Sequence, residues 1–173
     1  MVYEPTTDTI LLFGGQTTET GYSGSNALWS WNGTDWTLIH AHDASSATQP
    51  SPRGEHAMTY DAALGEVLLF GGSDSDGYCG NDNLVCGDFW RLDPNTFEWT
   101  EIITQGDKPE PRHSHAMVYD ESRDRVILLN GSSTWNAWEA ISNTPIDDLW
   151  EWDGTQWTQV IEDDGPGATV AHA

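Results

Sequence analysis

An arginine followed three residues later by a histidine recurs in the chain. Arg53 precedes His56 and Arg112 precedes His115, while His172 falls at the same place in a third stretch whose arginine position holds threonine. A guanidinium beside an imidazole can bind an anionic ligand. Residues that recur at one position of every repeat more often hold a scaffold together, since ligand residues tend to differ between repeats. We therefore expect a structural role, with anion binding as the alternative.

Four aromatic residues stand in polar, glycine-rich stretches. Tyr22 and Tyr78 each lie between glycines in similar segments, and Trp135 and Trp138 occupy a third such stretch. Exposed aromatic rings suit stacking on a sugar or anchoring a protein partner. The alternative is that these rings pack the loops against the strands, since glycine-flanked tyrosine is also typical of turns.

The two cysteines, Cys79 and Cys86, lie close together in one polar loop. They do not form a Cys-x-x-Cys motif, and no second pair completes a zinc site. We predict a local disulfide, and hence an extracellular or cell-surface protein whose secretion signal lies outside these residues.

No motif predicts a catalytic centre, a metal site or a cofactor. The histidine pairs at 40–42 and 113–115 would put two imidazoles on one strand face, but a third ligand is missing. The paired carboxylates at 147–148 and 163–164 are weak evidence for glycosidase chemistry in so acidic a chain. Nucleophile-elbow, P-loop and dinucleotide-binding motifs do not occur.

The charge of the chain excludes two classes of partner. Asp and Glu number 28 against six Lys and Arg, which gives a formal net charge of −22. Such a surface repels nucleic acid and anionic membranes, and no apolar run is long enough for a membrane-spanning helix. Ten tryptophans and regular apolar segments nevertheless predict a folded protein.

The apolar segments form three copies of one pattern. They recur at 1–4, 57–61 and 116–120, at 10–15, 67–72 and 126–131, at 28–31, 89–92 and 149–152, and at 36–37, 99–100 and 157–158. Each copy is typical of four short antiparallel strands, called a to d in chain order, without helical periodicity. Four antiparallel strands repeated radially make a propeller blade. We predict an all-β chain of three four-stranded antiparallel blades.

A glycine pair follows strand b in two copies, and two spaced tryptophans follow in all three. These are Gly14-Gly15 and Gly71-Gly72, with Trp29/Trp36, Trp90/Trp99 and Trp150/Trp157. The chain thereby resembles the kelch-repeat β-propeller family, of the secreted bacterial or archaeal type that includes galactose-oxidase-like propellers. The third copy departs with Asn130-Gly131, so its turn is expected to differ. We expect the tryptophans to pack between blades at about 1–52, 53–111 and 112–173, within a single partial propeller spanning 1–173.

The long connections fall on one side of the predicted blades. In an antiparallel blade the a–b and c–d turns share one side, and the b–c and d–a connections share the other. The long connections are 16–27, 73–87 and 132–147 between b and c, and 41–52 and 105–111 between d and a. We predict a non-enzymatic binding or scaffolding propeller that recognises a protein or glycan through this face.

The resemblance also implies an alternative, a fragment of a galactose-oxidase-like copper enzyme or another carbohydrate-active kelch enzyme. That family holds copper with tyrosines and histidines, one tyrosine being cross-linked to a cysteine. No residues of this sequence match that set.

Three blades are fewer than a propeller needs. Met1 falls on the repeat position of Met58 and Met117, and Ala173 on that of Ala57, so the chain holds three whole repeats. Propellers close with about four to eight blades. We expect the ring to be completed by further blades of a longer chain, or by a second copy that makes a six-bladed ring.

Overall fold

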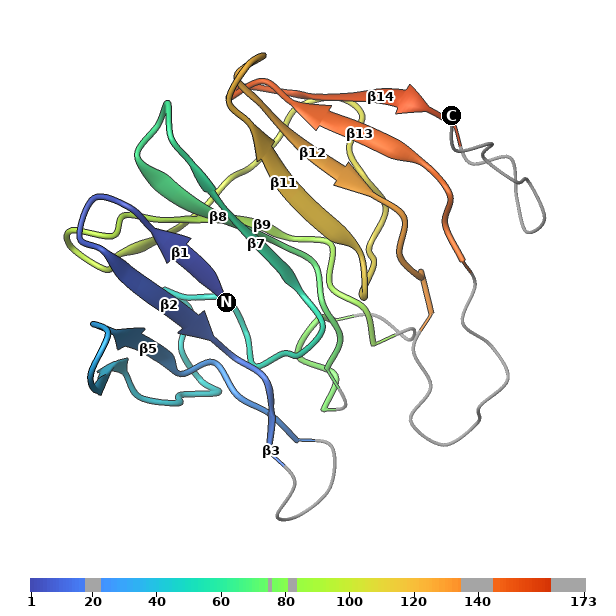
Figure 1. The fold of residues 1–173 in the computed structure, drawn as a ribbon. Helices are drawn as coiled ribbons and strands as arrows, with labels where there is room; N and C mark the ends of the chain where they lie inside the picture. The colour runs from blue at the N-terminus through green and yellow to red at the C-terminus, as the bar shows by residue number, and fades with distance from the viewer. Residues whose placement is uncertain (18–22, 75, 81–83, 135–144, 163–173) are drawn as a thin grey trace.

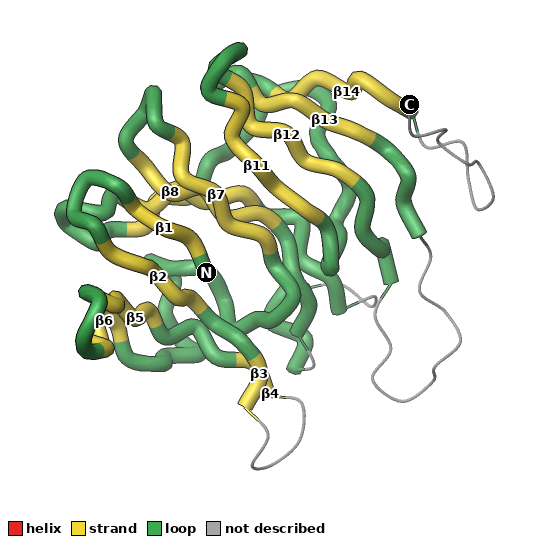
Figure 2. The backbone as a smooth tube through the Cα atoms, in the orientation of Figure 1, coloured by secondary structure: helices red, strands yellow, loops and turns green. Residues whose placement is uncertain are grey.

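A computed structural model describes residues 1–17, 23–74, 76–80, 84–134 and 145–162, and its regular structure is entirely β (Figure 2). The strands are β1 (Val2–Glu4), β2 (Thr9–Phe13), β3 (Gln16–Thr17), β4 (Ser23–Gly24), β5 (Leu28–Trp31), β6 (Trp36–His40), β7 (Ala57–Asp61), β8 (Glu66–Phe70), β9 (Phe89–Leu92), β10 (Trp99–Glu101), β11 (Ala116–Asp120), β12 (Arg125–Leu129), β13 (Leu149–Trp152) and β14 (Trp157–Ile161). No helix long and apolar enough to cross a membrane occurs among the described residues.

Twelve of these strands form three four-stranded antiparallel sheets. Their orders are β1-β2-β5-β6, β7-β8-β9-β10 and β11-β12-β13-β14, so each sheet is a meander of neighbouring strands. The prediction of three four-stranded blades is confirmed. The blades fan out side by side without closing into a ring (Figure 1).

Strand a of each blade lies at the centre of the fan. β7 packs beside both β1 and β11, so the three inner strands are neighbours (Figure 1). Strand b of the middle blade lies between its two neighbours, and in β8 the residues from Val67 to Phe70 are all buried. Strand d is the outer edge of each blade and is mostly exposed, as β6 and β14 are.

Apolar side chains of adjacent blades interlock into two cores. Leu11, Phe13 and Leu28 of the first blade pack with Leu69 and Trp99 of the second. Between the second and third blades, Phe70 and Phe89 meet Trp152 and Trp157, with ring centroids 5.0–6.0 Å apart. Trp90 and Trp99 lie in the first core and Trp150 and Trp157 in the second, so these four of the six predicted tryptophans pack between blades.

The outer face of the first blade is the exception. Trp36 occupies the repeat position of Trp99 and Trp157, yet it is 43% exposed while those two are 8% and 5% exposed. Its ring contacts Trp31 at 5.4 Å within the same blade. Trp36 and Leu38, which is 46% exposed, leave an apolar surface on this blade face.

Aspartate and asparagine side chains fix the short turns on the side opposite the long connections. Asp61 Oδ1 accepts the backbone N–H groups of Ala63 and Leu64 in the a–b turn of the second blade. Asn32 and Asp153 cap the c–d turns of the first and third blades in the same way. These side-chain caps make short hairpins that leave the strand ends on the other side free to carry long connections.

Candidate functional site

The recurring arginines are buried against an aspartate that precedes strand c of the same blade. Arg112 is fully buried and donates to Asp148 from Nη1 at 2.5 Å and from Nη2 at 2.7 Å. It also donates to the carbonyl oxygens of Asn130 and Glu110, at 3.0 and 3.1 Å. Asp148 accepts the indole N–H of Trp150 at 2.7 Å as well. This guanidinium is therefore committed inside the fold.

Arg53 has the same environment one blade earlier. It donates to Asp88 at 2.5 and 2.8 Å and to the carbonyl oxygen of Gly71 at 3.1 Å. In the first blade Ala27 precedes strand c, where Asp88 stands in the second, so that blade lacks the carboxylate. A buried guanidinium needs a complete set of acceptors, and both arginines have one. The geometry favours the scaffold interpretation of Arg53 and Arg112.

The glycine pairs leave room for the segment that carries the next arginine and histidine. Gly71 has φ +64, and a Cβ there would lie 2.4 Å from the carbonyl oxygen of Arg112 and 3.0 Å from Cε1 of His115. The N–H of Gly72 donates to the same carbonyl at 2.9 Å. A Cβ at Gly14 would likewise meet the carbonyl oxygen of the second blade's arginine at 2.6 Å. Each pair is thus a close contact between blades.

The turn of the third copy does not differ from the others, which corrects the sequence-based expectation. Asn130 has φ +57, close to the values of +66 and +64 at Gly14 and Gly71. Its N–H donates to the carbonyl oxygen of Asp148, as that of Gly71 does to Asp88. Asparagine is one of the few side chains that adopt this left-handed conformation readily, so the backbone is preserved without glycine.

The recurring histidines are neutral packing residues in this arrangement. The His115 ring meets Phe70 edge-on at 5.6 Å, and His56 meets Phe13 in the same way. Burial, together with the positive charge of the neighbouring arginine, lowers the pKa of both imidazoles to about 3. A neutral imidazole offers an anion no charge, so neither histidine supports the anion-binding alternative.

We expect the unfolding free energy to fall as the pH drops from about 7 toward 3, partly because of His115. The pKa of this group is about 3 when folded and about 6.5 when unfolded. Between those values the unfolded chain binds a proton that the folded chain does not, which favours unfolding. At about pH 5 the loss amounts to about 2 kcal/mol.

Urea unfolding at about pH 7 and about pH 5 measures this effect. The His115→Gln variant should lose less stability between the two pH values than the wild type. The exposed His42→Gln change should leave the loss unaltered. An equal pH dependence in wild type and His115→Gln would contradict the burial of a neutral imidazole.

A hollow opens among the long connections of the second blade. Its volume is about 320 Å³. The b–c connection, both flanking d–a connections and the end of β10 contribute to its walls. We call it the blade-2 hollow and define it by Ser51, Tyr78, Cys79, Asp88, Glu101 and Lys108.

Of the predicted ligand residues, Tyr78 and Arg53 line this hollow, and Tyr78 is 44% exposed whereas Arg53 is 1% exposed. Tyr22, Trp135 and Trp138 lie outside the described residues, as does His172. Sequence reasoning missed four polar residues here, namely Ser51, Asp88, Glu101 and Lys108. Only Lys108 carried a usable signal, because it is the single lysine of the chain.

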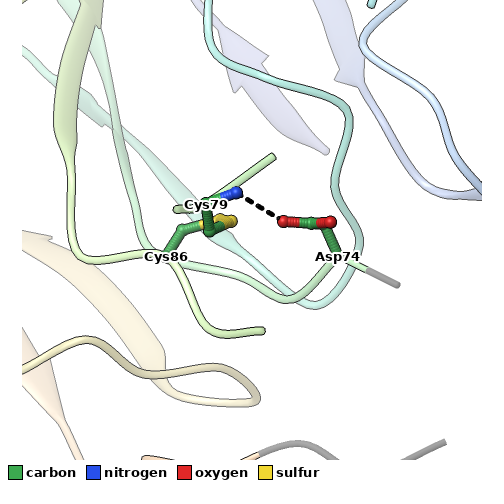
Figure 3. Close-up of side chains that lie close together, drawn as sticks. All are labelled: Asp74, Cys79 and Cys86. Carbon is green, nitrogen blue, oxygen red and sulfur yellow. Dashed lines mark hydrogen bonds between the residues drawn. A yellow bond between two sulfur atoms is a disulfide. The ribbon is translucent and has the colours of Figure 1, made fainter. Parts of the chain in front are cut away.

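Cys79 and Cys86 are joined in a disulfide at the wall of the hollow, as predicted (Figure 3). The neighbouring Asp74 carboxylate accepts the backbone N–H groups of Asp76, Tyr78 and Cys79 at 2.8, 3.0 and 2.7 Å. Among the described residues, one group of three possible metal ligands, Asp74 and the two cysteines, has its ligand atoms within 4.8 Å of one another. The sulfurs are bonded to each other and the carboxylate is used by the backbone, so these groups fix the loop that presents Tyr78.

Removing the disulfide should destabilise the chain modestly. The bond closes a loop with a sequence separation of 7, for which the chain-entropy model gives about 2–2.5 kcal/mol. The Cys79→Ser/Cys86→Ser variant should therefore stay folded, with a lower urea midpoint. Non-reducing peptide mapping of the wild type should give one cross-linked peptide. Two freely alkylated thiols would contradict the bond.

The histidine pair at 113–115 does not form a metal site. His113 Nδ1 contacts Glu55 Oε2 at 2.7 Å and its Nε2 contacts the carbonyl oxygen of Thr134 at 3.0 Å. Both ring nitrogens are thus used, Nδ1 in a contact between the second and third blades and Nε2 within the third. The copper alternative gains no support from the cysteines either, since Cys79 and Cys86 are bonded to each other.

Comparisons with known proteins agree with this geometry. The chain matches the KLHDC2/KLHL20/DRC7 Kelch-repeats domain over residues 1–172. Acyl-CoA-binding domain-containing protein 4 of Arabidopsis thaliana is 34% identical over 110 residues, which are 64% of this chain and 15% of the relative. Human host cell factor 2 is 28% identical over 152 residues, which are 83% of this chain and 18% of the relative.

A solved structure shows the same fold at a larger size. The structure of YjhT aligns with a TM-score of 0.64 and 16% identity, over 91% of this chain and 50% of that one. Four-stranded meander blades joined through glycine pairs and tryptophans define a β-propeller chain. This chain belongs to the kelch-repeat family, and it spans half of that solved propeller and less than a fifth of the two relatives above.

Proposed function

We propose that this chain is a non-enzymatic binding or scaffolding part of a kelch propeller. It recognises a protein or a glycan through the face that bears the long b–c and d–a connections. The observation that carries the proposal is the blade-2 hollow, which is built from three of those connections and contains an exposed tyrosine. Concave sites with an aromatic ring and a few convergent polar groups are typical of ligand binding.

The disposition of the recurring residues supports the same conclusion. Arg53, Arg112 and the two recurring histidines lie in contacts between strands and blades. Of the residues that define the hollow, Tyr78, Glu101 and Lys108 are the exposed ones. In repeat proteins the repeated positions hold the scaffold and the variable loops carry recognition.

Further blades complete the ring in this proposal, supplied by a longer chain or by a second copy. The exposed Trp36 face of the first blade is the surface that such a blade would cover, as the first blade covers Trp99. Light scattering on the 173-residue chain tests the second source. A two-fold dimer would support closure by a second copy, and a stable monomer would contradict the need for any closure.

The disulfide supports an extracellular or cell-surface location. Disulfides persist in oxidising compartments and are rare where thiols are kept reduced. The bond between Cys79 and Cys86 fixes the loop of the candidate site, so the oxidised form is the one expected to bind.

A screen of the purified chain against a glycan array and an extracellular protein library tests the function. We expect at least one ligand whose binding is lost in the Tyr78→Ala variant and kept in Tyr3→Ala, since Tyr3 is 54% exposed, against 44% for Tyr78, but lies on the inner strand β1. Binding that is equally sensitive to both changes, or no binding at all, would contradict the proposal.

A further inference from the structure

The blade-2 hollow offers a ligand one apolar surface, on Tyr78, and three polar side chains, those of Ser51, Glu101 and Lys108. The ring of Tyr78 is 44% exposed and supplies both a flat apolar face and a hydroxyl. Ser51 Oγ accepts a hydrogen bond from Arg53 Nη2 at 2.7 Å, which leaves its own proton available for donation. Lys108 and Glu101 are both exposed on the walls.

The two exposed charges of the hollow do not neutralise each other. No ion pair joins Lys108 or Glu101 to a partner within the described part of the chain. Among the described residues, the ammonium group of this single lysine therefore has no carboxylate partner. A donor and an acceptor stand on the walls of one hollow, available to a third molecule.

Hydroxyl groups fit such a pair better than an ion does. A sugar hydroxyl donates to a carboxylate and accepts from an ammonium group at the same time, and adjacent hydroxyls can span the two. The C–H face of the sugar ring then packs on the tyrosine, which adds apolar burial. Glu101, Lys108 and Tyr78 supply these three interactions.

The charge balance of the hollow favours a neutral ligand. The lining carries two positive and two negative formal charges, so its net charge is zero: Arg53 is paired with Asp88, and Lys108 and Glu101 are unpaired with each other. The whole chain carries a formal charge of −22, which repels an acidic sugar on approach. A basic peptide would meet Lys108 inside the hollow. A neutral saccharide avoids both penalties.

We propose that the blade-2 hollow binds a neutral saccharide unit that presents adjacent hydroxyl groups. Tyr78 packs against the sugar ring, Lys108 donates to the hydroxyls, and Glu101 accepts from them. This proposal rests on the proposed binding function and specifies its ligand class.

Saturation-transfer NMR and titration calorimetry with methyl glycosides of neutral hexoses test the proposal on the 173-residue chain. We expect Tyr78→Ala, Lys108→Ala and Glu101→Gln each to weaken binding about tenfold or more. The control Glu121→Gln removes the same charge on the opposite side of the molecule and should change affinity less than about twofold. Affinity should stay nearly constant from dilute buffer to molar sodium chloride, as expected for an uncharged ligand.

The outcomes separate this proposal from the function on which it rests. If neutral glycosides bind and none of the three substitutions changes their affinity, the blade-2 hollow is not the binding site, while the proposed binding function stands. If a protein or a charged sugar is the ligand that depends on Tyr78, the ligand class is wrong and the function stands. If neither glycans nor proteins bind, the proposed function itself fails. Circular dichroism of each variant, with the wild-type spectrum expected, shows that lost binding is not lost folding.

Discussion

Replacing Arg112 by alanine is expected to lower the unfolding free energy by about 3–5 kcal/mol. The change leaves Asp148, which is 4% exposed, with a buried carboxylate and the N–H of Trp150 as its remaining side-chain donor. It also leaves the carbonyl oxygen of Asn130 without its guanidinium donor. The penalty is large because the charge stays buried after its partner has gone. Urea unfolding at neutral pH measures it.

Arg123→Ala is the matched control for this prediction. Arg123 makes two ion pairs, with Asp120 at 2.7 Å and Glu151 at 2.6 Å, yet its side chain is 53% exposed. Exposed pairs contribute about 0–1 kcal/mol, so the control should lose little. An Arg112→Ala variant that keeps its stability but loses a ligand would overturn the scaffold interpretation and restore the anion-binding one.

Gly71→Ala is expected to destabilise the chain by about 2–5 kcal/mol. The left-handed backbone at φ +64 costs an alanine about 1–2 kcal/mol. Its Cβ would also press on a backbone oxygen of the next blade at 2.4 Å, and such overpacking typically costs about 1–3 kcal/mol more. Because Arg112 supplies that oxygen, the clash moves the segment that leads into the third blade.

Gly154→Ala separates the two contributions. Gly154 has φ +91, and a Cβ there meets nothing within 4 Å. This control should therefore show only the backbone cost, about 1–2 kcal/mol. Equal losses in both variants, read from the urea midpoints, would mean that the glycine pair serves the turn alone and makes no essential contact between blades.

The blades could be predicted because their signal is local and repeated. Strands such as β8 read as short apolar runs, and the three copies of the pattern set their number and order. Asparagine at position 130 was expected to alter a turn, but its φ of +57 lies where glycine stands in the other copies. That expectation failed because residue identity changed while backbone conformation did not.

The partners of the recurring residues could not be predicted. Arg53 and Asp88 are 35 residues apart, on either side of a connection whose length differs between blades. With 28 acidic residues in the chain, no sequence rule selects Asp88 as the acceptor. The hollow could not be predicted for a similar reason. Glu101 and Lys108 are distant from Tyr78 in the sequence and come to line one hollow with it only in the folded blade.

Ligand-dependent hydrogen–deuterium exchange tests the central claim most directly, that recognition belongs to the long connections of the second blade. The probe is the array or library ligand that binds the 173-residue chain. Slowed exchange is predicted in peptides around Tyr78 and Lys108, with the turn that follows Asp120 unchanged. Protection confined to the short-turn side, or to the inner strands β1, β7 and β11, would contradict the account.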